Sequence, residues 1–224
     1  MDTANGGPRG TGRENLKPRP PPSYVLRGDM KIIGISGSPR AGGNTEVLLS
    51  HALEPFRGQG WAIVEFLLSG KSVAPCNGCD GCAETRDCVI RDDMDLLYAE
   101  LPSCDALIIA SPIYYRNVSA QLKAVFDRSY AIRGSAPLAG KAGGAITVGR
   151  GEGGGQALGL AVIYNFLLSS GAVCVAGELN GVTARADKPG EIINQPKRLE
   201  QARILGENVL RYAALLREAR NGSG

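Results

Sequence analysis

Histidine is almost absent from this chain, and two kinds of apolar segment are missing as well. His51 is the only histidine in 224 residues, so triad or other histidine-based acid–base chemistry is nearly excluded. No apolar run approaches the roughly 20 residues that a membrane helix needs, and the N-terminus lacks the apolar region of a signal peptide. We therefore expect a cytoplasmic protein with no membrane partner, in a reducing compartment where structural disulfides are rare.

Excess positive charge is also missing from most of the chain. The net charge is +3, and residues 1–28 account for all of it, with five basic side chains against Asp2 and Glu14. The remainder is neutral, so no basic face predicts a nucleic-acid partner. Residues 1–28 are rich in Gly and Pro and show no periodicity, which predicts a disordered tail. We expect one domain over residues 29–224.

From Met30 onward, short apolar runs alternate with amphipathic segments. Strands are predicted over 31–38, 61–68, 105–112, 141–149 and 172–178, and helices over 44–56, 92–102, 119–132, 156–171 and 195–219. Each crossover is long enough for a helix, so the pattern predicts a doubly wound α/β fold with a five-stranded parallel sheet in the order 2-1-3-4-5. In such a fold, ligands bind beyond the carboxyl ends of the strands.

The loop SGSPRAGGNT, residues 36–45, leaves the first predicted strand and enters a helix. Its backbone N–H groups and the helix dipole favour an anion, and a phosphomonoester suits its hydroxyl groups. No G-K-[ST] follows, so this is not a Walker A loop. The alternative is a Ser/Gly turn with a good N-cap. The side chains available to an anion are Ser36, Ser38, Arg40, Asn44 and Thr45.

Two further loops follow predicted strands. SPIYYRNVS, residues 111–119, places a proline and two tyrosines where a flat wall could support a planar ring. The alternative is that Tyr114 and Tyr115 pack under a loop. TVGRGEGGG, residues 147–155, meets the G-x-G-x-x-G pattern only formally, because Gly-rich sequence satisfies it easily. We interpret it as a third wall around the same ligand.

Four of the six cysteines lie within CNGCDGCAETRDC, residues 76–88. The spacing Cys76-x2-Cys79-x2-Cys82-x5-Cys88 lets one loop wrap thiolates around a cubane, as in bacterial ferredoxins. Zinc is the rival metal, although four-cysteine zinc sites usually use two well-separated knuckles. Unligated thiols are a further alternative. Outside the stretch, Cys104 and Cys174 have apolar neighbours, and we expect inert thiols there.

Taken together, GISGSPRAGGNT, ASPIYYRNVSAQLKAVFDR and the glycine loop after the fourth strand resemble the flavodoxin-like NADPH-dependent FMN reductase superfamily. The cysteine stretch is similar to that of its iron–sulfur flavoprotein branch. The resemblance covers about residues 30–215 and implies FMN, with its phosphate in the first loop and its isoalloxazine ring against the other two. It also implies a [4Fe–4S] cluster in a loop spanning 74–92. The implied FMN residues are Ser36, Ser38, Pro39, Arg40, Asn44, Thr45, Ser111, Pro112, Ile113, Tyr114, Tyr115, Thr147, Gly149 and Gly151, and the implied metal ligands are Cys76, Cys79, Cys82 and Cys88.

The expected function is that of an FMN-dependent oxidoreductase, which couples two-electron flavin chemistry on a small molecule to one-electron transfer through the cluster. Three alternatives stay open: an NAD(P)H-dependent FMN or quinone reductase without a cluster, a dehydrogenase of a small anionic metabolite, and a redox sensor or electron carrier. Arg185 and Lys188, in a polar segment over 177–192, would serve an anionic substrate. The family resemblance favours a homodimer or homotetramer, and a ferredoxin-type electron partner is a further expectation.

Overall fold

The computed structural model describes residues 30–151 and 154–222, and the predicted tail over 1–28 lies outside these residues. The strands are β1 (Lys31–Ser36), β2 (Ala62–Leu67), β3 (Ala106–Tyr114), β4 (Asn117–Val118), β5 (Ala142–Gly149), β6 (Val173–Cys174) and β7 (Val182–Arg185). The helices are α1 (Asn44–Arg57), α2 (Gly81–Thr85), α3 (Met94–Glu100), α4 (Ala120–Arg128), α5 (Gly155–Ser169) and α6 (Pro196–Gly222), with 3-10 turns η1 (Leu101–Ser103), η2 (Ser129–Ser135) and η3 (Glu191–Asn194).

The main strands form a parallel sheet in the order β2-β1-β3-β5-β6. This is the predicted order 2-1-3-4-5, so the fold prediction is confirmed. The two-residue strand β4 adds an antiparallel hairpin to the end of β3. Since right-handed crossovers carry the helices to both faces, the sheet is buried from above and below.

The fifth strand differs from the prediction of one strand over 172–178. β6 ends at Cys174, and the main chain turns away from the sheet after Val175, whose N–H still donates to the Gly143 carbonyl at 2.8 Å. The chain returns as β7, which pairs with the other end of β5. β7 lies inside the polar segment 177–192, where its four residues were too few to predict a strand.

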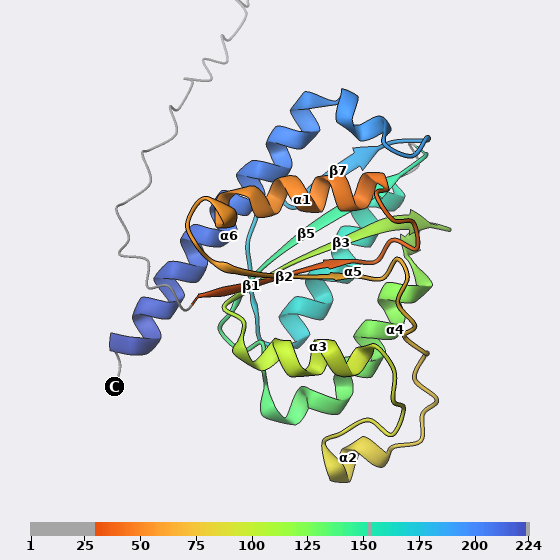
Figure 1. Ribbon diagram of the computed structural model, residues 1–224, viewed down its shortest axis with the longest axis vertical. Coiled ribbons are helices and arrows are strands. Elements are labelled where there is room, and N and C mark those ends of the chain that lie inside the picture. The colour runs from red at the N-terminus through yellow and green to blue at the C-terminus, as the bar shows by residue number, and fades with distance from the viewer. Residues whose placement is uncertain (1–29, 152–153, 223–224) are drawn as a thin grey trace, which may run out of the picture.

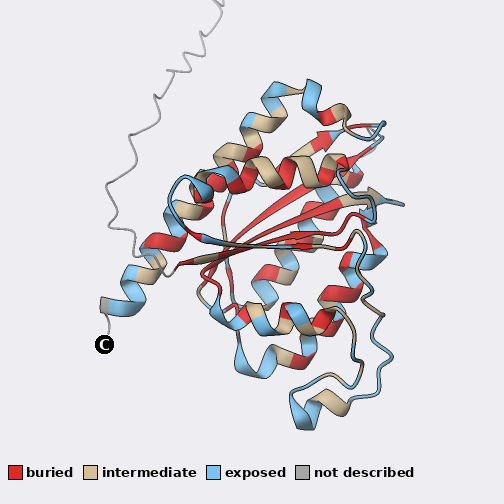
Figure 2. Ribbon diagram, in the orientation of Figure 1, coloured by how far each residue is buried: buried red, intermediate tan, exposed pale blue. Residues whose placement is uncertain are grey.

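Two helical layers cover the sheet (Figure 1). α1 and α6 pack on one face, while α3, α4 and α5 pack on the other, each over its own group of buried apolar side chains. The strands are buried almost throughout, and exposure is concentrated on the outer helix faces and on the segment around α2 (Figure 2). α6 approaches α1 closely at Gly206, where a Cβ atom would lie 2.0 Å from the Ala52 carbonyl oxygen.

Two helix ends follow the local sequence signals. Ser119 caps α4, because its hydroxyl accepts a hydrogen bond from the Leu122 N–H at 3.2 Å. α5 is followed by Gly171 at φ +77°, the left-handed conformation that favours glycine after a helix. None of the helices within the two described ranges is long and apolar enough to cross a membrane.

Candidate functional site: the strand-end loops and the cysteine segment

The sheet register brings the three predicted cofactor loops to one edge. Ser36 at the end of β1 pairs with Ala110, the neighbour of Ser111 in β3, and Ser111 pairs with Thr147 in β5. Ser36, Ser111 and Thr147 are all fully buried. Because parallel strands end on the same side of the sheet, residues more than 100 positions apart in the chain form one continuous edge.

The first loop ends at the N-terminus of α1, where Gly43 is the extended N-cap and no side chain of the described residues provides the cap. The first helical N–H groups are therefore left to an external acceptor. Ser38 stabilises the turn before the helix: its hydroxyl donates to the Arg40 carbonyl and accepts from the Arg40 N–H, both at 3.1 Å. Thr45 is buried in the first turn, while Pro39 and Arg40 are exposed beside it.

Two side chains at this helix start have partners that sequence reasoning missed. The Asn44 amide donates to the Lys188 carbonyl at 2.8 Å and accepts from the Ile192 N–H at 3.1 Å, so it ties the loop to the η3 segment. The Glu46 carboxylate accepts from the Gly42 N–H at 2.6 Å and from the Ser69 hydroxyl at 2.7 Å. An acidic residue in the first turn of a helix was the available signal for this contact.

Ser119 connects the first loop to the second. Its hydroxyl donates to the Gly37 carbonyl at 2.6 Å, and its N–H donates to the Ser111 hydroxyl at 3.1 Å. Gly37 itself is packed so closely that a Cβ atom would lie 2.8 Å from the Cβ of Leu122 and 2.9 Å from the Ser119 hydroxyl. The start of α4 is thus held against the end of β1, which keeps the two loops at a constant separation.

The second loop presents its aromatic residues to solvent. Tyr115 and Arg116 form the turn between β3 and β4 with φ values of +46° and +67°, the backbone of a tight hairpin turn. Tyr114 is 41% exposed and Tyr115 is fully exposed, so neither packs under the loop. Pro112 and Ile113 are half-buried beside them.

The third loop is braced by Gln156 at the start of α5. The Gln156 side chain donates to the carbonyls of Gly149 at 3.4 Å and Gly151 at 2.8 Å, and the main-chain carbonyl of Gln156 accepts from the Thr147 hydroxyl at 3.0 Å. In the neighbouring polar segment, Arg185 Nε donates to the Arg150 carbonyl at 2.9 Å, and Arg150 pairs with Asp187. Side chains of Gln156 and Arg185 thus hold the third loop in place through hydrogen bonds to its main-chain carbonyls.

The cysteine segment, residues 74–92, runs from the end of β2 to α3 and projects from the body of the domain (Figure 1). Cys76, Cys79, Cys82 and Cys88 line one cavity of about 370 Å³. Burial raises the pKa of Cys82 above its ordinary value, and the charges of the other three thiols raise it further. Within the part of the chain that the structure describes, no three His, Cys, Asp or Glu side chains lie close enough together to hold a single metal ion.

Arg128 at the end of α4 holds both ends of the cysteine segment. Its Nη1 donates to Asp92 at 2.7 Å and to the Ala74 carbonyl at 3.2 Å, and its Nη2 donates to the Ile90 carbonyl at 2.9 Å. Burial alone would raise the pKa of Asp92, but hydrogen bonds from Arg128 and from backbone N–H groups leave it below its ordinary value. An arginine at the end of an amphipathic helix gave no signal of this role in the sequence.

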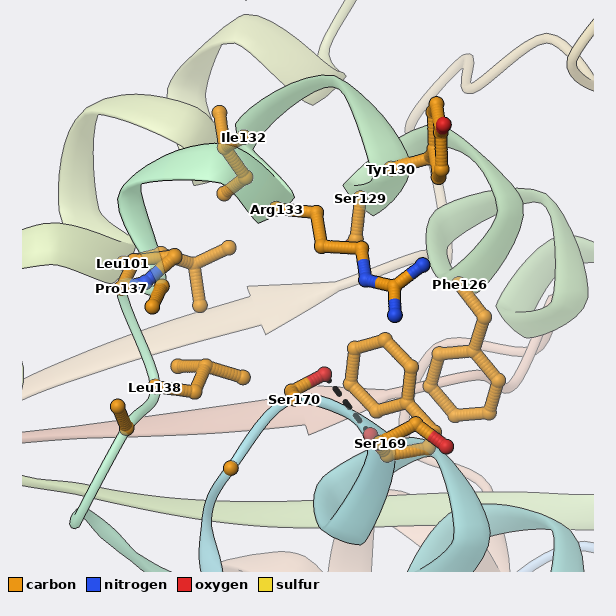
Figure 3. A pocket seen from close by; sticks show the side chains of 14 residues that line it. Leu101, Phe126, Ser129, Tyr130, Ile132, Arg133, Pro137, Leu138, Ser169 and Ser170 are labelled. Atoms are coloured by element: carbon orange, nitrogen blue, oxygen red, sulfur yellow. Dashed lines mark hydrogen bonds between the residues drawn. The ribbon is translucent and has the colours of Figure 1, made fainter.

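A larger cavity, of about 470 Å³, lies between α4, η2 and the end of α5 (Figure 3). Its wall includes Phe126 and Phe166, whose rings stack with centroids 4.1 Å apart. Phe126 and Tyr130 also line the cysteine cavity, so the two cavities share a wall. None of the predicted cofactor residues lines the larger cavity.

The remaining cysteines and the histidine have structural surroundings. Cys104 is buried, its thiol donates to the Leu101 carbonyl at 3.2 Å, and burial raises its pKa to about 11. Burial likewise raises the pKa of Cys174. Both groups stay protonated at neutral pH, which agrees with the expectation of inert thiols. His51 lies on α1 and contacts Glu54 at 3.2 Å, away from the strand ends.

Comparison with known proteins decides the family. The family model of the NADPH-dependent FMN reductases matches residues 30–184. The chain belongs to the NADPH-dependent FMN reductase family. It is 38% identical to an iron–sulfur flavoprotein of Methanocaldococcus jannaschii, over 84% of this chain and all of that protein. It is 40% identical to an iron–sulfur flavoprotein of Methanosarcina thermophila, over 69% of this chain and 82% of that one.

These similarities place this FMN reductase family member in the iron–sulfur flavoprotein branch, and it is a flavin-dependent oxidoreductase. Solved structures agree on the fold. A WrbA-like flavodoxin from Agrobacterium tumefaciens is similar with a TM-score of 0.58 and 19% identity, over 85% of this chain and 98% of that one. RosB is similar with a TM-score of 0.66 and 16% identity, over 84% and 81% of the two chains.

Proposed function

We propose that this protein couples two-electron flavin chemistry on a small molecule to one-electron transfer through a [4Fe–4S] cluster. The observation that carries this proposal is the single cavity lined by Cys76, Cys79, Cys82 and Cys88, in a chain of the FMN reductase family. Bound FMN would supply the two-electron step and the cluster the one-electron step. The residues present are suited to both groups.

The strand-end loops fit a flavin phosphate in their chemistry. The uncapped start of α1 offers N–H groups, and Arg40 adds an exposed positive charge next to them. Asn44 and Glu46 shape this loop through their contacts to η3 and Ser69. The exposed rings of Tyr114 and Tyr115 and the backbone of the other two loops would border the planar part of the cofactor.

The four thiols of the cysteine segment are a donor set suited to a multinuclear iron centre. A cubane binds each thiolate to a different iron, and the four cysteines of this segment line one cavity. Gly78 adopts φ +69°, and Asp80 and Arg86 both adopt φ +56°. These left-handed residues bend the chain sharply between the cysteines, so that one short segment can face its thiols inward.

α4 separates the two sites within one chain. Ser119 at its start contacts the strand-end loops, and Arg128 at its other end contacts the cysteine segment. α4 has nine residues, Ala120–Arg128, which is a length of about 14 Å at 1.5 Å per residue. We propose a cytoplasmic homodimer or homotetramer, in which a neighbouring subunit brings its cluster closer to the flavin, with a ferredoxin-type protein as electron partner.

The visible spectrum of anaerobically purified protein, with iron and sulfide assays, tests this function. We expect flavin bands with a broad brown shoulder, and about four iron and four sulfide per chain, the composition of a [4Fe–4S] cluster. A yellow protein without iron would contradict the cluster and leave the flavin site standing. One zinc per chain would assign the segment to a structural metal.

The second candidate is an NAD(P)H-dependent FMN or quinone reductase without a cluster, and the matching family model favours it. Anaerobic mixing with NADPH separates the two: rapid bleaching of the flavin in iron-free protein supports the simple reductase. A dehydrogenase that takes a small anionic metabolite would use Arg185, which contacts the third loop, and Lys188, whose carbonyl contacts Asn44 of the first loop. That reaction predicts flavin bleaching by the metabolite and none by NADPH.

A further inference from the structure

One buried donor next to the cysteine segment has no partner in the protein. In residues 30–151 and 154–222, the buried side-chain nitrogens without a hydrogen-bond partner are Trp61 Nε1 and Arg128 Nε. The Arg128 side chain is 0% exposed. Buried polar groups are nearly always hydrogen-bonded, and a charged one left unpaired is particularly unfavourable. The Arg128 Nε–H therefore indicates a missing acceptor.

The surroundings of Arg128 indicate which group could accept a hydrogen bond from its Nε–H. Its side chain belongs to the wall of the cavity that the four cysteines line. Its two terminal nitrogens already donate hydrogen bonds to the Asp92 carboxylate and to the carbonyls of Ala74 and Ile90. Within the described residues, Nε is the one guanidinium nitrogen of Arg128 that has no acceptor. The same wall includes the four cysteine thiols and also Asp80 and Asp127. Neither of these carboxylates accepts a hydrogen bond from Nε, whereas thiolate sulfurs ligated to iron accept hydrogen bonds.

We propose that Arg128 is a positioning residue for the cluster, and that its Nε–H donates a hydrogen bond to a cluster sulfide or to a ligating cysteine sulfur. This inference rests on the proposed function, since it requires the cluster to be present. Arg128 then has two tasks. It holds the two ends of the cysteine segment together, and it places a fixed positive charge beside the iron centre.

A fixed positive charge has a defined effect on redox behaviour. Reduction adds one negative charge to the cluster, and a nearby guanidinium stabilises the reduced form more than the oxidised form. Hydrogen bonds to the sulfurs act in the same direction. Arg128 therefore raises the reduction potential of the cluster. Asp92, whose carboxylate lies 2.7 Å from Nη1, offsets part of this effect.

The test is an EPR-monitored redox titration of the full-length protein, purified anaerobically with its cofactors. Arg128→Gln removes the charge and the Nε–H, and we expect at least a tenfold shift of the one-electron reduction equilibrium toward the oxidised cluster, about 59 mV. Asp92→Asn keeps the guanidinium but removes its counter-charge, and we expect a shift of the opposite sign. If Arg128 only anchored the segment, the two variants would not shift the reduction potential in opposite directions.

Two further variants isolate the hydrogen bond. Arg128→Lys keeps the positive charge and lacks Nε, so we expect a shift in the direction of Arg128→Gln but smaller. Arg91→Gln is the matched control, because Arg91 is an exposed arginine of the same segment, paired with Asp87 and Asp95. We expect its potential to equal that of the wild type.

The outcomes separate this inference from the proposed function. Wild-type protein that binds no iron contradicts the function itself. Wild-type protein with a full cluster, together with Arg128→Gln at an unchanged potential, overturns only the role of Arg128. If Arg128→Gln retains no cluster, Arg128→Lys and Asp92→Asn decide. Arg128→Lys at the wild-type potential overturns the hydrogen bond, and a lowered potential supports it.

Discussion

The strand-end loops and the cysteine segment are held in place by different means. The strand-end loops follow fully buried strands, and buried hydroxyls such as Ser36, Ser111 and Thr147 lie at their base. The cysteine segment contains one helix of five residues, α2, with no buried residue. It is attached to the domain mainly through Arg128. The first site is thus held by the fold, whereas the cysteine segment would gain much of its order from the proposed cluster.

Loss of one ligand should give the largest effect, and only in the cysteine segment. Cys79→Ser removes one of the four thiolates, so we expect loss of nearly all iron and of the brown absorbance, with FMN retained. Cys174→Ser is the control and should keep full iron, because Cys174 lies in β6 outside the segment. Iron, sulfide and flavin assays on anaerobic protein measure this. Full iron in Cys79→Ser would contradict the ligand assignment.

Strain at the base of the strand-end site should give the next largest effect. Gly37→Ala places a Cβ atom 2.8 Å from the Cβ of Leu122, and overpacking of this kind typically costs about 1–3 kcal/mol. We expect a lower free energy of unfolding and weaker flavin binding, measured by denaturant titration and fluorescence. Gly58→Ala is the control, because a Cβ there has ordinary contacts, the nearest at 3.7 Å. Equal stability of the two variants would contradict the close packing.

Removal of one charge at the start of α1 should weaken the flavin site alone. Charged hydrogen bonds contribute about 1.5–3 kcal/mol, so Arg40→Gln should raise the Kd of FMN by roughly tenfold or more. Riboflavin, which lacks the phosphate, should bind both proteins equally. Arg57→Gln, at the far end of α1, should leave FMN binding unchanged. A fluorescence titration that shows the same loss for riboflavin would remove Arg40 from the phosphate site.

Chelation of the metal should have the smallest effect on the domain as a whole. We expect faster amide exchange over residues 74–92 and little change in the strands, because α2 has no buried residue and the sheet has its own core. Hydrogen-exchange mass spectrometry with and without chelator measures the difference. Faster exchange in β1 and β3 after chelation would show that the strand-end site also depends on the metal, and would contradict the difference between the two sites.

Local sequence signals were sufficient for most of the fold. Alternating apolar runs predicted the strand order, and Gly171 marked the end of α5. They failed at the fifth strand, where four residues of β7 within a polar segment pair with β5. The cysteine spacing was visible in the sequence, but the contacts of Asn44 to Lys188 and of Arg128 to Asp92 were not. Contacts over such separations leave no local pattern.

The sequence by itself determined which chemical groups the chain carries: a loop rich in hydroxyl and N–H donors after the first strand, and four closely spaced thiols. These depend on residue type and short spacing, which are local properties. The tertiary structure decided how that chemistry is arranged. It packed Ser119 against Gly37 at one end of α4 and placed Arg128 under the cysteines at the other. It also left the Arg128 Nε–H unpaired. Burial creates such an unpaired donor, and burial depends on the whole chain. In the sequence, CNGCDGCAETRDC is therefore a set of closely spaced thiols. In the fold, the buried Arg128 side chain lines the same cavity as these thiols.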